Sequence, residues 1–98
     1  MPEEKILTLH PDPSKAGVNI LRRRYELMKE TILGILSRNG AVSFRDLTEE
    51  AGKELTGVLD GNIPWYVVVV KQDLEARGVI QQVPGKKPQQ LRLVEPNA

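Results

Sequence analysis

Apolar residues recur at helical spacing between residues 63 and 77, just before Gly78. Five of them fall on one side of a helix, at i, i+3, i+4, i+7 and i+11: Ile63, Tyr66, Val67, Val70 and Leu74. Asn62 suits the N-cap, and Pro64 suits the first turn, where a missing N–H costs little. Four consecutive valines also fit a buried strand, but the KQDLEAR sequence that follows favours a helix.

Two earlier segments show the same period. A helix is predicted over residues 20–38, with Asn19 as its cap and Asn39-Gly40 at its end. Its buried side would be formed by Leu21, Tyr25, Met28, Ile32, Ile35 and Leu36. After a short edge strand at 41–43, a second helix is predicted over 44–55, with Ser43 opening a capping box. Its buried side would be formed by Phe44, Leu47, Ala51 and Leu55.

The C-terminal part of the chain predicts a β-hairpin. Strands are expected at 79–83 and 89–94, joined by the loop 84–88, whose tip is basic. The chain thus divides into an N-terminal arm (1–18), an α+β domain (19–94) and a C-terminal tail (95–98). The predicted core consists of Tyr25, Met28, Ile32, Leu36, Phe44, Leu47, Ala51, Tyr66, Val67, Val70, Leu74, Ile80, Leu91 and Leu93.

The arm allows two interpretations. Ile6, Leu7 and Leu9 could form a short strand, with Leu7 and Leu9 on one face, before prolines interrupt regular structure. The arm is then either a loose terminus or a segment whose apolar residues cover part of the domain.

The composition excludes several kinds of site and of protein. The chain has 98 residues, no cysteine and a formal net charge of +1, so disulfides and cysteine zinc sites are excluded. No run approaches the roughly 20 apolar residues of a membrane span, and no secretory signal is recognisable, so we expect a cytoplasmic protein without membrane contact.

Residues that could support catalysis are scarce. The single histidine, His10, lies in the arm without a neighbouring base or ligand, and Glu49-Glu50 is typical of a solvated helix surface. We therefore expect no enzyme, no metal, no cofactor and no small-molecule ligand.

The order helix, short strand, helix, turn, helix, strand, basic loop, strand over residues 19–94 resembles a winged helix-turn-helix domain, with three helices and a small antiparallel β-hairpin wing. The most specific local similarity is residues 73–80, DLEARGVI, which look like the end of a third helix entering a wing. Within that superfamily, the segments 17–20, 25–33 and 65–80 are similar to a small uncharacterised bacterial family.

The resemblance implies a DNA-binding protein, with a regulatory or accessory role and double-stranded DNA as its partner. The helix over 63–77 would lie in the major groove and the hairpin would contact the flanking backbone. The candidate DNA-binding residues are Arg45, Lys71, Gln72, Lys86, Lys87 and Arg92. Gln72 is the one good reader of base edges among them, and Asp73 and Glu75 would lie near the phosphates and repel them.

The outer side of the same helix predicts an alternative. Trp65, Val68 and Val69 would form an apolar patch typical of an interface. This patch could join two copies in a homodimer, or the arm could cover it, or the helix phase could differ from the prediction. The alternative function is therefore a winged-helix protein-interaction or dimerisation module that does not bind DNA.

Overall fold

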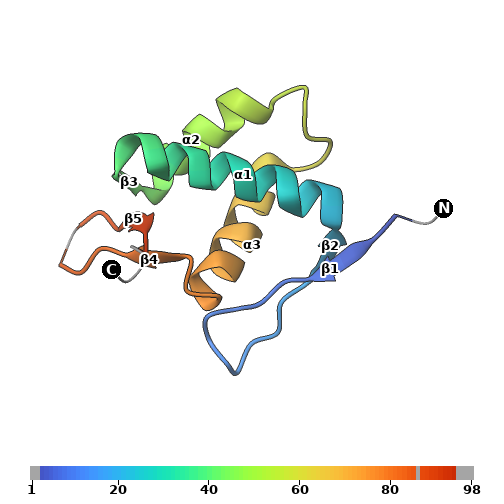
Figure 1. Cartoon of the computed structure of the whole chain (residues 1–98), viewed down its shortest axis with the longest axis horizontal. Coiled ribbons are helices and arrows are strands. Elements are labelled where there is room, and N and C mark those ends of the chain that lie inside the picture. The colour runs from blue at the N-terminus through green and yellow to red at the C-terminus, as the bar shows by residue number, and fades with distance from the viewer. Residues whose placement is uncertain (1–2, 86, 95–98) are drawn as a thin grey trace.

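The computed structural model describes residues 3–85 and 87–94 and shows an α+β fold with three helices and two small antiparallel sheets (Figure 1). Along the chain the elements are β1 (Lys5–Leu7), β2 (Asn19–Leu21), α1 (Arg22–Asn39), β3 (Ala41–Ser43), α2 (Phe44–Leu55), α3 (Ile63–Ala76), β4 (Ile80–Gln82) and β5 (Gln90–Leu93).

The three helices pack against one another around one core, as the three apolar stripes predicted. All of the predicted core residues are buried except Phe44 and Leu93, which are partly exposed and pack against the core from its edge. Caps explain where the later helices begin. The Ser43 hydroxyl accepts from the Asp46 N–H at 3.1 Å, and the Asn62 side chain accepts from the Trp65 N–H at 3.0 Å. The four valines of α3 are therefore helical, because core packing outweighs their low helix propensity.

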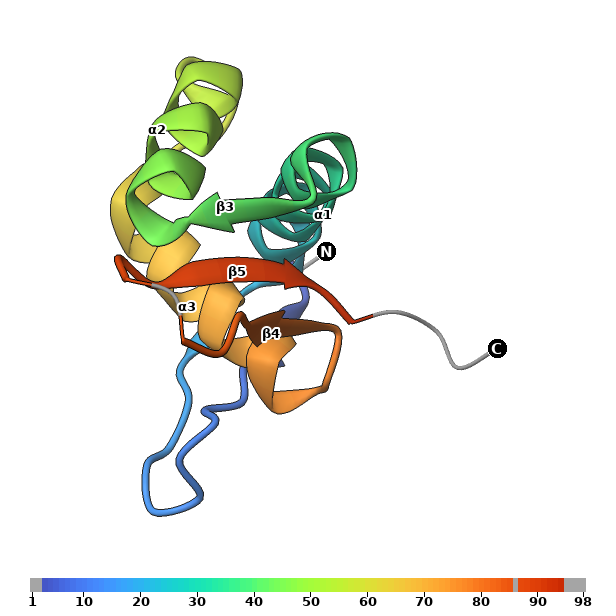
Figure 2. The ribbon, with the colours of Figure 1, turned by 90° about the vertical axis from the view of Figure 1, so that its left-hand side faces the viewer.

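A three-stranded sheet with the order β3-β5-β4 closes one end of the core. Val42 of β3 pairs with Leu91 of β5, and Ile80 of β4 pairs with Leu93. These side chains face the helices, so the β4–β5 hairpin lies beside the C-terminal part of α3 (Figure 2). Gly78 has φ +76°, a conformation open to glycine, and it turns the chain from α3 towards β4.

The start of the first helix differs from the prediction. Residues 19–21 form β2, which pairs with Lys5–Leu7, and α1 begins at Arg22 rather than near Ile20. The apolar pattern alone could not show this, because Ile20 is buried in either conformation and its strand partner lies far back in the sequence. The arm is thus a β-hairpin attached to α1, and Ile6 packs against the core.

Gly17 allows the two sides of this hairpin to approach closely. A Cβ atom at Gly17 would lie 1.7 Å from the Thr8 carbonyl oxygen, so Gly17→Ala must force the strands apart. We expect the Thr8 amide, which donates to the Val18 carbonyl at 2.9 Å, to exchange with solvent at least ~10-fold faster by NMR.

Gly52→Ala is the matched control. A Cβ at Gly52, within α2, meets no described heavy atom within 4 Å, so this change should stabilise the protein by up to about 1 kcal/mol. Unchanged Thr8 exchange in Gly17→Ala would contradict the close approach.

Candidate nucleic-acid interface

Three segments meet at Phe44, the first residue of α2. The Phe44 N–H donates to the Gln89 carbonyl at the base of the β4–β5 hairpin, at 3.3 Å. The Lys71 ammonium of α3 lies 5.3 Å from the centre of the Phe44 ring, a cation–π contact. Figure 2 shows the start of β5 below the first turn of α2, with α3 behind the hairpin. This place, which we call the Phe44 junction, brings Lys71 and the base of the hairpin at Gln89 together beside Arg45.

Lys71 is neutralised within the fold. Its Nζ lies 2.8 Å from Glu75 Oε1, and the two side chains are only 12% and 10% exposed. The Gln82 amide of β4 donates to the other Glu75 oxygen at 3.1 Å. The Lys71 contact is an ion pair without hydrogen-bond alignment, since Oε1 accepts no hydrogen bond from any described group. Glu75 therefore lies at the junction and is bound to Lys71.

Other predicted contact residues on α2, α3 and the hairpin loop are more accessible. The Arg45 side chain is 87% exposed, and its only ion pair with a described residue is a 3.5 Å contact to Glu49. Lys87 is exposed in the hairpin loop, and Gln72 is half-buried on α3. Lys86, the other predicted contact in the loop, lies outside the described residues.

Arg92 lies away from the junction. Its neighbour on β5, Leu91, is buried, so Arg92 points to the opposite, outer face of the sheet. Arg92 also lines a cavity of ≈ 500 Å³ where the end of α1 meets β5, together with Ser37 and Gly40. The predicted contact residues therefore divide between two surfaces.

The prediction that Asp73 would lie near phosphates and repel them is wrong, because the side chain is buried. It is fully buried and accepts from the Leu9 N–H at 2.8 Å, from the Tyr25 hydroxyl, and from the Arg77 guanidinium at 2.9 Å. Burial, together with the hydrogen bond to Asp73, raises the pKa of Tyr25 to about 12. Asp73 thus joins the arm, α1 and α3. Asp73 follows the buried Val70 by three residues, so helical spacing places it beside the core side of α3. We assigned it to the surface because of its charge.

The three arginines at the start of α1 also bind within the fold. Arg22 pairs with Glu4 at 2.6 Å, and Arg23 pairs with Glu3 at 2.7 Å. Arg23 and Arg24 both contact Asp60 in the α2–α3 turn, and their guanidinium groups hold the pKa of that carboxyl well below its usual range. These arginines tie the arm and the turn to α1.

The predicted apolar patch is smaller than expected. Trp65 is 44% exposed and Val68 is partly buried, but Val69 belongs to the core. Val69 lies one helical turn before Asp73, on the side where the arm is anchored, so its assignment to the outer face was wrong. The arm therefore approaches this side of α3, although Leu7 and Leu9 themselves point to solvent.

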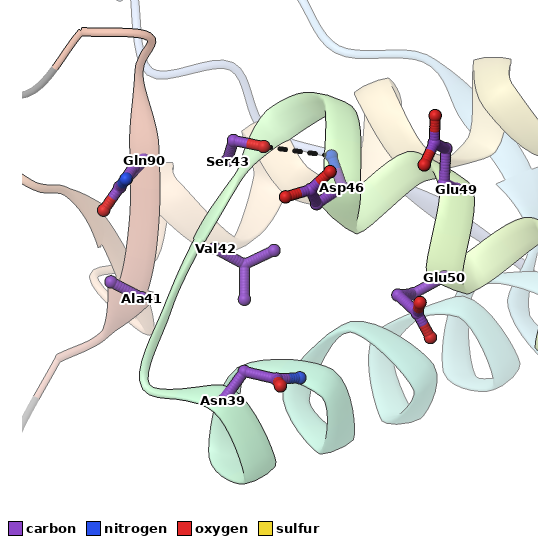
Figure 3. Close-up of a pocket in the computed structure, with 8 residues that line it drawn as sticks. All are labelled: Asn39, Ala41, Val42, Ser43, Asp46, Glu49, Glu50 and Gln90. Carbon is purple, nitrogen blue, oxygen red and sulfur yellow. Dashed lines mark hydrogen bonds between the residues drawn. The ribbon is translucent and has the colours of Figure 1, made fainter.

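A hollow of ≈ 340 Å³ lies between α2, β3 and the end of α1, and Figure 3 shows the side chains that line it. Asp46, Glu49 and Glu50 make it acidic, and Gln90 completes its rim. Within residues 3–85 and 87–94, no group of three or more His, Asp or Glu side chains could hold a metal. The hollow thus adds negative charge beside Arg45.

None of the helices in the described part of the chain is both long enough and apolar enough to cross a membrane.

Comparison with known proteins gives a family but no activity. Residues 5–91 match a family described as "Family of unknown function (DUF6958)", and because this segment covers most of the chain, the protein belongs to that family. No curated protein and no solved structure matches the chain.

Proposed function

We propose that this family member is a winged-helix protein that binds duplex DNA, mainly through backbone phosphates. The Phe44 junction carries the proposal, because it unites the start of α2, the middle of α3 and the hairpin that follows α3. In winged-helix proteins the corresponding elements meet DNA, with the third helix in the major groove.

The charges of the junction favour binding with little sequence discrimination. Arg45 and Lys87 are exposed cations suited to phosphate contacts, which supply most of the non-specific affinity for DNA. Gln72 is the one side chain on the outer side of α3 suited to reading a base edge, and it is half-buried. A regulatory or accessory role on DNA would then depend on weak, salt-sensitive binding.

A salt titration with a fluorescent random-sequence duplex tests the proposal. We expect the binding constant to fall steeply between about 50 and about 200 mM salt, with a slope of roughly 0.9 per phosphate contact. The double variant Arg45→Ala/Lys87→Ala should weaken binding and reduce that slope by about 1.8, since two contacts are lost.

Lys15→Ala/Lys53→Ala is the control, because it removes the same charge from the arm loop and the far end of α2. Equal losses in both double variants would mean that the junction is not the contact surface. No binding at low salt would reject the proposal.

The second candidate, a protein-interaction or homodimerisation module, is favoured by one observation. Trp65 is a large aromatic residue with 44% exposure at the start of α3, and exposed aromatic residues are typical of interfaces. A protein that fails to bind duplex DNA but sediments as a dimer, and becomes monomeric on Trp65→Ala, would have this function instead.

A further inference from the structure

The ion pair with Glu75 neutralises Lys71, the cation of α3 that lies at the Phe44 junction. We propose that Glu75 acts as an internal competitor for DNA phosphate: it neutralises Lys71 and thereby limits the affinity of α3 for DNA. This inference rests on the proposed DNA binding and concerns how that binding is restrained.

The surroundings of Glu75 hold its carboxylate against Lys71. One oxygen lies 2.8 Å from the ammonium, and the other accepts from Gln82 of β4. The Phe44 ring lies against the ammonium on another side. Both charged side chains are about nine-tenths covered, so water and salt screen this pair less than an exposed pair. A phosphate must therefore displace Glu75 before it can contact Lys71.

Helix stability does not explain the pair. Lys71 precedes Glu75 by four residues, which is the less favourable order of an i,i+4 ion pair in a helix. Glu75 also lies in the last turn of α3, where the helix dipole disfavours a negative charge. In this position the carboxylate neutralises Lys71 without the full helical benefit of the reverse order, at the junction where DNA is proposed to bind.

Glu75→Gln tests the inference, since the amide keeps the size and the contact to Gln82 but loses the charge. In titrations with random duplex at low salt, we expect about tenfold tighter binding than the parent and a salt slope steeper by roughly 0.9, for one added phosphate contact. Glu54→Gln, which removes an acidic partner of Arg38 away from the junction, changes net charge equally and should leave the affinity within about twofold.

A double-mutant cycle with Lys71→Gln separates release of Lys71 from simple loss of repulsion. If Glu75→Gln acts by freeing Lys71, its effect should shrink to less than about twofold when Lys71 is already Gln. An effect of the same size in both backgrounds, or no gain over the parent, overturns the inference while the proposed function stands.

If neither the parent nor Glu75→Gln binds duplex DNA, the proposed function itself has failed. Circular dichroism would confirm that each variant is folded. If Glu75→Gln does not fold, Glu75→Ala replaces it under the same criteria, because alanine is a strong helix former.

Discussion

Replacing Asp73 with alanine is expected to lower the free energy of unfolding by about 3 kcal/mol. Three groups depend on this buried carboxylate: the Leu9 N–H, the Tyr25 hydroxyl and the Arg77 guanidinium. In the variant the buried Tyr25 hydroxyl and the part-buried Leu9 N–H would remain without their acceptor, and each buried unsatisfied group costs about 1–3 kcal/mol. Arg77 adds less, because its side chain is 39% exposed and water can replace the lost partner.

Urea denaturation monitored by circular dichroism measures the change in unfolding free energy caused by Asp73→Ala. Glu54→Ala, at an exposed ion pair with Arg38, is the control and should change the free energy of unfolding by no more than about 0.5 kcal/mol. If Asp73→Ala were as mild as Glu54→Ala, Asp73 would not anchor the arm. Faster exchange of the Leu9 amide in Asp73→Ala would locate the damage at the arm.

Leu74→Ala is expected to cost about 2–5 kcal/mol of unfolding free energy, a large share of the stability of a domain of this size. Leu74 is fully buried on α3 at the centre of the core, so its removal leaves a cavity that the rigid packing of three helices cannot close. Ile32→Ala on α1, equally buried, should have a similar effect for the same reason.

Leu7→Ala makes the comparison direct, because it is the same substitution at a side chain that is 58% exposed. It should change the free energy of unfolding by at most about 0.5 kcal/mol. Similar denaturation midpoints for Leu74→Ala and Leu7→Ala would contradict the helical phase of α3, on which the whole packing of this protein depends.

The helices and the hairpin are features that local sequence patterns predict. The phase of α3 followed from five apolar residues at helical spacing, and its ends followed from Asn62 and Gly78. The β4–β5 hairpin likewise followed from two short apolar segments around a Pro-Gly loop. Such features depend on neighbours a few residues apart, so one sequence suffices to predict them.

The candidate site was less predictable. The sequence indicated Lys71 and Arg45 as candidate DNA-binding residues. It did not predict the contact with Glu75 that neutralises Lys71. Arg92 was grouped with them, although strand alternation carries it to the outer face of the sheet. Whether a charged side chain is available to a partner depends on what folds beside it, and the residue type does not reveal this.

Taken alone, the amino-acid sequence determined the α+β class, the three helices, the hairpin and most of the core, because apolar periodicity records which side of each element is buried. Only the tertiary structure decided that the arm pairs with residues 19–21, that Val69 and Asp73 face inward, and that Lys71 is bound to Glu75. The arm and inward-facing contacts join residues far apart in the chain. The Lys71–Glu75 pair is local in sequence, but its burial depends on Phe44 and Gln82 packing around it.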